Sequence, residues 1–383
     1  MKTFSVILLL VSGALMLAIG QSTKKHDGSD ENKKHACFSK QVRTEAERTA
    51  RVYHEPDAGY DPVLGYSPST GPHRGAPPID ANGLALPFAC KANVKDDLGP
   101  GTLPKFYCSV EGTTDEDGKL IRYKIKPHFK GPSPEKRNGE VYGEFLSSRF
   151  SQAMGFYAHD AWVADVTCPD CEKSLTKKFQ GAPFSPFQPA AGIELSLGKG
   201  IDVDCNGNEY GPLARSLDGL AESDERRPEI DAFKLWLAFI DHGDTKTTNE
   251  HFACLKSAAA DDGTLKCEAP IYFVSDMGST FGYSSASEKK ARLDLWKKKD
   301  PIRVTGDKCY TTAKDIGDPR IIEAGRKILA DNLQRLLDAE AKDATITRVF
   351  RASRNSERDQ PAEAWTAEFI RKANTVIHAK CSD

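Results

Sequence analysis

Regular spacing of hydrophobic residues begins at Lys105 and continues towards the end of the chain. Over residues 141–154, large apolar side chains recur every three or four positions and stop before Gly155, a pattern that predicts one amphipathic helix. Similar spacing predicts further helices over residues 229–240, 319–337, 341–352 and 362–379. The C-terminal part is therefore expected to be mostly α-helical.

Short hydrophobic runs predict β-strands over residues 106–110, 120–126, 161–166, 249–255 and 271–274. The first two are joined by a polar turn, residues 111–119, that contains two glycines. A hairpin of this kind could cover a bound phosphate, although most such hairpins have no nucleotide nearby. Residues 173–208 are expected to be irregular, because they contain Pro183, Pro186 and Pro189.

The first 104 residues show no sustained periodicity. Residues 1–20 resemble a secretory signal, with Lys2 at the start, an apolar run and a small-residue cleavage site before Gln21. Residues 21–50 are assigned to a disordered tether, since their first part is charged and polar. Residues 51–104 are rich in proline and glycine, and we expect an extended segment that wraps the main domain, pinned by Cys37 and Cys90.

Composition narrows the possible partners and the compartment. A net charge of −2 gives no reason to expect nucleic acid as a partner. No segment of the mature chain is apolar and long enough to predict a transmembrane span. Together with the predicted signal, this favours a secreted or periplasmic protein.

All ten cysteines lie beyond residue 20, and an even number in an exported chain favours disulfides. Cys254 and Cys267 flank a predicted hairpin, so we expect them to pair. Cys168 and Cys171 are expected to form one structural disulfide or two, with a redox pair as the alternative. A zinc site is disfavoured, because no second Cys or His pair completes the usual four ligands.

Two polar phrases carry the candidate chemistry. Residues 242–249 read His-Gly-Asp-Thr-Lys-Thr-Thr-Asn, and residues 275–278, after a predicted strand, read Ser-Asp-Met-Gly. Phosphoryl transfer needs a carboxylate for the acceptor proton, oxygen ligands for magnesium and cations at the phosphates. We assign Asp244 as the base, Lys246 as the cation at the transferred phosphate, and Asn249 and Asp276 as magnesium ligands. Gly278 is expected to allow a sharp turn after Asp276.

An upstream pair could face these residues. Lys126 ends a predicted strand and is the candidate phosphate-binding lysine, with Lys124 on the same strand face as the alternative. Glu144, on the helix predicted over residues 141–154, is the candidate partner of the lysine. Glu140, one turn earlier, is the weaker choice. His242 is expected to be a packed loop residue rather than a ligand or base.

The order of these motifs resembles the protein-kinase-like superfamily. Residues 242–249 look like the catalytic loop of eukaryotic-type kinases, with Gly243 where arginine is usual. Residues 144–156 and 275–282 look closer to atypical bacterial relatives, which include HipA-type enzymes, lipid-kinase-like enzymes and an exported group. Met277 replaces the usual phenylalanine, and no Ala-Pro-Glu motif follows.

The resemblance covers residues 105–282 and implies a two-lobed α+β fold of the protein-kinase-like type. A small antiparallel β lobe with one helix would span residues 105–185, and a mostly α-helical large lobe would span 186–383. It also implies Mg-ATP as the nucleotide, whereas the sequence supplies no acceptor, so that protein, lipid, glycan and small molecule all remain open.

Each motif is weak on its own, because polar turns and strand ends of this kind are common. Their single occurrence in the expected order favours an exported, ATP-dependent phosphotransferase. Retention of Lys126, Glu144, Asp244, Asn249 and Asp276 supports this hypothesis. The alternative is a catalytically inactive kinase-like (pseudokinase) binding domain stabilised by disulfides, which the scarcity of ATP outside the cytoplasm favours. A third hypothesis is a disulfide-rich envelope protein unrelated to kinases.

Overall fold

The structure is a computed structural model, and the residues that it describes all lie in one unit of the chain, Ala36–Asp383. They are residues 37–92, 105–115, 118–127, 129–130, 133–137, 139–168, 191–201, 225–245, 249–282, 291–313, 317–355 and 359–382. The predicted signal, residues 1–20, and the predicted tether up to residue 36 lie outside these ranges.

The largest sheet has five strands in the order β2-β3-β4-β9-β7, and every neighbouring pair is antiparallel. The strands are β2 (Lys91–Ala92), β3 (Phe106–Thr114), β4 (Leu120–Pro127), β7 (Asp160–Ala164) and β9 (Ala191–Leu195). The strands predicted over residues 106–110 and 120–126 are confirmed, although β3 continues to Thr114, into the predicted turn. The strand predicted over 161–166 is divided between β7 and a short strand, β8 (Val166–Thr167).

Strands β9 and β10 (Lys199–Gly200) lie within residues 173–208, so the prediction that this region is irregular was wrong for residues 191–195 and 199–200. The closely spaced prolines all precede β9, and its five residues are too few to show a clear alternation. β9 also follows the lobe boundary predicted at residue 185, yet it pairs with β4 and β7, which precede that boundary.

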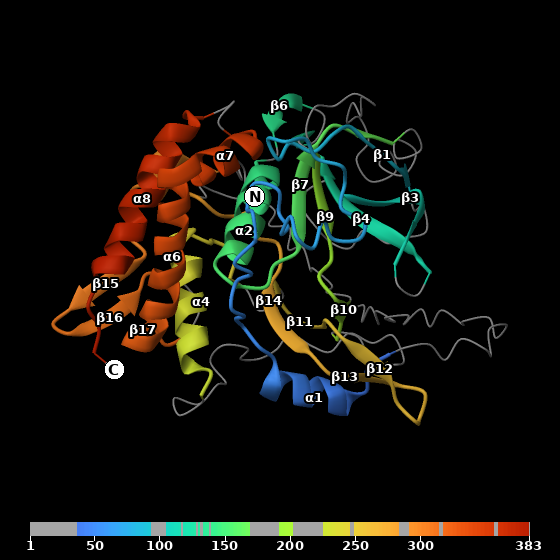
Figure 1. The fold of residues 1–383 in the computed structure, drawn as a ribbon, viewed down its shortest axis with the longest axis horizontal. Coiled ribbons are helices and arrows are strands. Elements are labelled where there is room, and N and C mark those ends of the chain that lie inside the picture. The colour runs from blue at the N-terminus through green and yellow to red at the C-terminus, as the bar shows by residue number, and fades with distance from the viewer. Residues whose placement is uncertain are drawn as a thin grey trace, which may run out of the picture. The chain divides into compact units, whose positions relative to one another are not determined.

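The two faces of this sheet have different neighbours. Phe106, Ile125, Trp162 and Ile193 belong to a hydrophobic core on one face. Helix α2 (Glu140–Ala153) contacts β7 and β9 on the other face and also contacts α7, as Figure 1 shows. Because α2 lies between other elements, nearly all of its residues are buried, including the polar ones.

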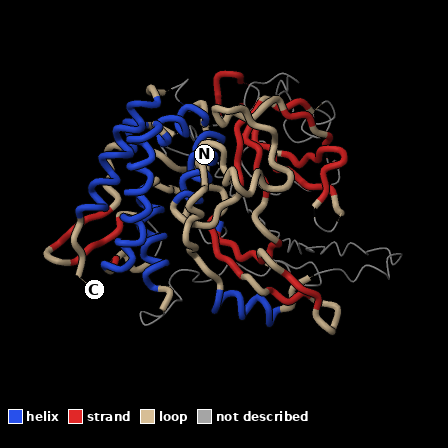
Figure 2. The backbone as a smooth tube through the Cα atoms, in the orientation of Figure 1, coloured by secondary structure: helices blue, strands red, loops and turns tan. Residues whose placement is uncertain are grey.

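Four helices form the C-terminal part: α4 (Arg227–Phe239), α6 (Glu323–Asp343), α7 (Thr345–Ala352) and α8 (Ala362–His378). They pack against one another (Figures 1 and 2). Their buried side chains share one hydrophobic core with those of α2. The predicted helices are confirmed, but α6 begins later and continues to Asp343 instead of ending at Leu337. Its last turns are built from good helix formers, and Ala344, with φ of 58°, ends the helix in the left-handed conformation.

A three-stranded sheet lies beside the candidate loops. It contains β10 (Lys199–Gly200), β11 (Glu250–Cys254) and β14 (Pro270–Val274), of which the last two match the predicted strands. The remaining described elements are short: α1 (Lys40–Thr49), α5 (Leu293–Trp296), β1 (Phe88–Ala89), β5 (Phe129–Lys130), β6 (Ser133–Arg137), β12 (Ser257–Ala259), β13 (Leu265–Cys267), β15 (Ile302–Thr305), β16 (Lys308–Thr311) and β17 (Arg320–Ile321).

Helix α1 occupies residues that the sequence assigned to the disordered tether. Ser39 caps it by accepting a hydrogen bond from the Val42 amide (3.3 Å), and Ala46 is buried. The guanidinium of Arg43 is also buried and lies 5.0 Å from the ring centroid of Phe252. A helix that buries an arginine and few apolar residues leaves a weak hydrophobic pattern, which explains why its sequence was not recognised.

Three disulfides join described residues: Cys90–Cys108, Cys254–Cys267 and Cys309–Cys381. The predicted Cys254–Cys267 pair is confirmed. Cys37 and Cys168 are also disulfide-bonded, and no cysteine that the structure describes is free. Within the described ranges, no helix is both long and apolar enough to cross a membrane.

Candidate functional site

Lys126 lies at the centre of a buried cluster of charged residues. Its Nζ is 2.7 Å from Glu144 Oε1 on α2 and 2.7 Å from Asp276 Oδ1 in the loop after β14. Strand β4 and helix α2 therefore present the two residues that the sequence paired. Lys126 contacts Glu144 directly, whereas Glu140 is the weakest of the carboxylates that act on it.

Lys124 takes part in a second ion pair. Its Nζ lies 3.0 and 3.2 Å from the two carboxylate oxygens of Glu194, which is directly opposite on β9. Glu194 Oε2 is also 3.7 Å from the Nζ of Lys126, so this carboxylate connects both lysines. The sequence left two candidates for the phosphate-binding lysine. In the structure, Lys126 contacts the predicted partner Glu144 and also Asp276, whereas Lys124 contacts Glu194.

Sequence reasoning missed Glu194, because it lies in the unrecognised strand β9. A weak signal was present: in Ala-Gly-Ile-Glu-Leu, an acidic residue stands two positions after a glycine in an otherwise apolar run. Lys126 pairs with that glycine, Gly192, in the register, and Lys124 pairs with Glu194. His159 approaches the same carboxylate, with its Nε2 3.8 Å from Glu194 Oε1. Burial lowers the pKa of His159 to about 4, so the imidazole is neutral at pH 7.

Burial and neighbouring charges set the protonation of the cluster. Burial raises the pKa of Glu144 to about 8, although Lys126 opposes this shift. Lys126 holds the pKa of Asp276 well below its usual range. Burial also acts against ionised Glu194, but Lys124 and Lys126 outweigh it and lower the pKa of that carboxyl.

The contact between Glu144 and Lys126 would favour an ionised Glu144, which conflicts with its raised pKa. The count of charges resolves the conflict. Two ammonium groups, those of Lys124 and Lys126, face the three carboxyl groups of Glu144, Glu194 and Asp276. Negative charge exceeds positive charge among these five groups, and burial together with repulsion by Glu194 holds the pKa of Glu144 above its usual value.

The two polar phrases lie side by side. The Gly243 amide donates to the Ser279 carbonyl (2.8 Å), and the Ser275 amide donates to the Asn249 carbonyl (2.7 Å). His242 is buried, as expected for a packed loop residue, and both Asp244 and Asp276 act on its charge. Burial nevertheless lowers the pKa of His242 to about 4. These contacts bring Asp244, Asn249 and Asp276 into one region next to the Lys126 cluster.

Helix α2 is fixed to the loop that carries Asp276. The Ser147 hydroxyl donates to the Met277 carbonyl (3.2 Å), and that of Thr280 donates to the Gly143 carbonyl (3.2 Å). A Cβ atom placed on Gly278 would lie 2.6 Å from the Cβ of Glu140, and one on Gly143 would lie 2.4 Å from the Gly278 carbonyl oxygen. Glycine at both positions is what allows the helix and the loop to approach this closely.

The expected role of Gly278 in a sharp turn needs correction. The left-handed conformation occurs at Asp276 itself, with φ of 54°, and Gly278 is not among the residues with positive φ. Asp241 (φ of 51°) and Phe281 (φ of 55°) adopt the same conformation in the two loops. Such conformations are unfavourable for residues other than glycine and are frequent at functional sites.

The hairpin turn within residues 111–119 cannot cover a ligand at Lys126. The register pairs Phe106 with Ile125 and Thr114 with Leu120, so the turn lies at the opposite end of β4 from Lys126. Six residues of extended strand separate the two positions by about 20 Å. That sequence-based suggestion was wrong, because hairpin recognition alone does not indicate which end of the strands carries the site.

The residues near Asp276 fit a magnesium site. Asn249 Nδ2 donates to the Asp244 carbonyl oxygen (2.9 Å), and since that oxygen can only accept, the amide oxygen of Asn249 is left to bind a cation. The Asp276 side chain is 34% exposed, and its Oδ1 is the oxygen that contacts Lys126. No group of three or more acidic, His or Cys side chains arranged for a metal occurs among the described residues. Magnesium needs only one or two protein carboxylates when phosphates and water complete its coordination. Lys246, the remaining candidate, lies outside the described residues.

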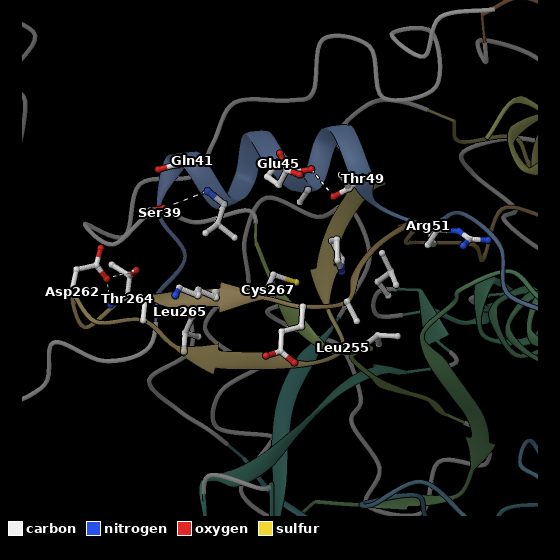
Figure 3. A pocket seen from close by; sticks show the side chains of 18 of the residues that line it. Ser39, Gln41, Glu45, Thr49, Arg51, Leu255, Asp262, Thr264, Leu265 and Cys267 are labelled. Atoms are coloured by element: carbon white, nitrogen blue, oxygen red, sulfur yellow. Dashed lines mark hydrogen bonds between the residues drawn. The ribbon is translucent and has the colours of Figure 1, made fainter. Parts of the chain in front are cut away.

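A separate pocket lies between α1 and the β12–β13 hairpin (Figure 3). Its volume is about 780 Å³, and its lining includes Ser39 and Glu45 from one side and Thr264 and Leu265 from the other. None of the candidate site residues lines it. The pocket is therefore distinct from the Lys126 cluster.

Comparisons with known proteins do not assign this chain to a family. No protein-family model matches the sequence, and a search of curated proteins finds no match. Among solved structures, the chain is similar to a Helicobacter pylori proinflammatory kinase, CtkA, with 11% sequence identity and a TM-score of 0.42. The similarity covers 76% of this chain and 96% of that one. At this TM-score the similarity is too weak to assign a fold or an activity.

Proposed function

We propose that the chain is an exported phosphotransferase that uses Mg-ATP on a two-lobed protein-kinase-like fold. In this proposal, the five-stranded sheet and α2 form the small lobe, and α4 and the C-terminal helices belong to the large lobe. The observation that carries the proposal is the contact of Lys126 with both Glu144 and Asp276. A lysine held between two acids from distant parts of the chain can bind phosphate while one acid binds the metal.

Each residue then has a definite task. Lys126, positioned by Glu144, donates hydrogen bonds to the phosphate chain of the nucleotide. Asp276 and the amide oxygen of Asn249 hold magnesium, which when bound would neutralise charge on the phosphates. Lys246 remains a predicted cation at the transferred phosphate. Glu194 holds Lys124 beside Lys126, and Ser147 and Thr280 keep α2 against the Asp276 loop.

In the transfer step, Asp244 orients the acceptor hydroxyl and takes its proton. The acceptor oxygen forms a bond to the terminal phosphorus as the bond from that phosphorus to the bridging oxygen breaks, and ADP leaves with the bonding electron pair. The hydrogen bond from Gly243 to Ser279 and that from Ser275 to Asn249 fix Asp244 relative to Asp276. Catalysis on this proposal comes mainly from positioning and charge neutralisation.

An oxidising compartment is supported by the disulfides between described residues. This agrees with export by the predicted signal sequence. The acceptor class, whether protein, lipid, glycan or small molecule, is not specified by any contact that the structure describes.

Two substitutions separate binding from turnover. Mg-ATP should raise the melting temperature of the wild type, and Asp276→Ala should abolish this shift because it removes a metal ligand. Asp244→Ala should keep the shift but lower ADP release by roughly 10²–10⁴-fold. Asp261→Ala, at an exposed turn outside the cluster, is the matched control and should behave as the wild type.

The possible results distinguish the hypotheses. Absence of any shift in the wild type would exclude nucleotide binding. A shift without measurable turnover in the wild type would instead indicate an inactive nucleotide-binding domain. Wild-type turnover in Asp244→Ala would remove Asp244 from its assigned role.

A further inference from the structure

Lys105 lies beside the charged cluster, and none of the roles above uses it. It immediately precedes β3, and Phe106, the next residue, pairs with Ile125 on β4. One step further along this antiparallel register, Lys105 stands opposite Lys126. Residues opposite each other in a sheet point to the same face, with Cβ atoms about 4.5–5.5 Å apart. Lys105 therefore belongs to the sheet face that carries Lys124, Lys126 and Glu194.

Lys105 differs from its two neighbours in its contacts. Lys126 is in ion pairs with Glu144 and Asp276, and Lys124 is in an ion pair with Glu194. Lys105 is half-buried and makes no hydrogen bond or ion pair with any residue that the structure describes. Asp276 and Glu194 act on it only at longer range, and their effect is smaller than that of the two neighbouring lysines.

Without a bound anion, the ammonium group of Lys105 is consequently in an unfavourable electrostatic environment. Burial and the like charges of Lys124 and Lys126 lower the pKa of Lys105. The carboxylates of Glu194 and Asp276 are already in contact with Lys124 and Lys126. The ammonium of Lys105 adds a further positive charge to this face of the sheet. An anionic group bound there would relieve the repulsion.

We propose that Lys105 is a third cation of the ligand site, which binds a phosphate group in a chain of phosphates. This inference rests on the proposed function, because it assumes that phosphate binds at Lys126. Three linked phosphate groups carry more negative charge than one lysine and one magnesium ion neutralise. The site is thus suited to a triphosphate, either of a nucleoside or as inorganic tripolyphosphate, rather than to a single phosphate monoester.

The test compares dissociation constants of the full chain for Mg-ATP and magnesium tripolyphosphate, measured by isothermal titration. Lys105→Gln removes the positive charge and leaves a polar side chain that is one atom shorter. It should weaken binding of each ligand that the wild type binds by roughly tenfold, the effect of losing one charge-assisted contact. Lys105→Arg should retain most of the affinity. Lys119→Gln, an exposed lysine at the far end of the same hairpin, is the matched control and should have no effect.

The results separate this inference from the function on which it rests. If the wild type binds and Lys105→Gln binds equally well, the inference fails and the proposed function stands. If Lys105→Arg binds as weakly as Lys105→Gln, the charge is not responsible and the inference also fails.

The two ligands locate the contact. When the wild type binds both, a loss of affinity for Mg-ATP without a loss for tripolyphosphate would place Lys105 at the nucleoside and overturn the inference. If the wild type binds Mg-ATP but not magnesium tripolyphosphate, the ligand is a nucleotide. The effect of Lys105→Gln on Mg-ATP binding then decides whether the inference holds. No binding of either ligand by the wild type would refute both proposals.

Discussion

Glu144 shows how a single buried side chain can carry the pH dependence of this protein. It faces Lys126 at 2.7 Å, and Glu194, Lys124 and Asp276 also act on its charge. Burial raises its pKa from 4.5 to about 8. A carboxyl group with a higher pKa in the folded protein favours folding at low pH, and this contribution is lost as pH rises through the folded value.

We therefore predict that Glu144→Gln changes the pH profile of stability. Between pH 4.5 and 8, the wild type should lose stability relative to the variant, because the unfolded carboxyl is ionised there while the folded one keeps its proton, so that only folding of the wild type must take up a proton. The loss is about 1.4 kcal/mol for each pH unit by which the folded pKa exceeds the unfolded one, and hence a few kcal/mol at most. Melting temperatures of both proteins across this range measure the difference. Parallel curves would show that Glu144 does not titrate there.

At the residue scale, the sequence predicted Lys126, Glu144, Asn249 and Asp276 because each stands in a recognisable local context. Lys126 ends a strand, Glu144 lies on a strongly periodic helix, and the other two flank predicted strands. Glu194 and Lys105 lack such a context. The place of Glu194 depends on the register of β9 with β4, which lie far apart in the sequence, and such a register is not encoded in a local pattern. Lys105 lies in a local hairpin, but its register with β4 shifts between Ser109 and Thr114, and the sequence does not show this irregularity.

At the scale of elements, the site depends on how closely α2 approaches the loop of residues 275–281. The helix itself was predictable from its apolar positions, but its burial on almost every side was not. Buried Glu144, Ser147 and Ser148 would count as exposed in an amphipathic helix, yet each has a polar partner in the structure. A hydrophobic pattern identifies the helix without showing that its polar side faces other protein elements.

The close approach predicts a large effect of one methyl group. In Gly278→Ala the new Cβ would lie 2.6 Å from the Cβ of Glu140 and 2.9 Å from its carbonyl oxygen, so α2 or the loop must move. We expect a loss of about 1–3 kcal/mol in the free energy of unfolding, together with a smaller Mg-ATP-induced shift in melting temperature.

The matched control is Gly200→Ala in β10, where a Cβ would meet nothing within 4 Å. This variant should stay within about 0.5 kcal/mol of the wild type in urea denaturation. Wild-type stability and binding in Gly278→Ala would show that the contact with Glu140 is not a constraint.

At the scale of the whole molecule, the sequence predicted the α+β class and most of the helices, but not how separate segments combine. The five-stranded sheet takes β9 from beyond residues 169–190, which lie outside the described structure, and β2 from the end of the wrapping segment. The disulfides are similar in this respect. The short Cys254–Cys267 pair could be predicted from a local hairpin, whereas Cys309–Cys381 spans 72 positions and has no local signal.

This difference in span predicts a difference in stabilisation. The chain-entropy model gives about 4 kcal/mol for the loop closed by Cys309 and Cys381, and about 3 kcal/mol for that closed by Cys254 and Cys267. The double variant Cys309→Ala/Cys381→Ala should therefore lower the midpoint of urea denaturation more than Cys254→Ala/Cys267→Ala does. An equal or smaller effect of the long-span pair would argue that local packing, rather than loop closure, dominates.

If the chain binds Mg-ATP as we propose, the direct contact between Lys126 and Asp276 makes magnesium and nucleotide interdependent ligands. Each of these side chains neutralises the charge of the other. A metal ion that binds Asp276 would therefore free Lys126 to contact the phosphates. Phosphates that bind Lys126 would likewise free Asp276 to coordinate the metal. Coupling of this kind is reciprocal: magnesium should tighten nucleotide binding by the same factor by which nucleotide tightens magnesium binding. The ligand-free protein should consequently discriminate against either ligand alone and bind the two together with positive cooperativity.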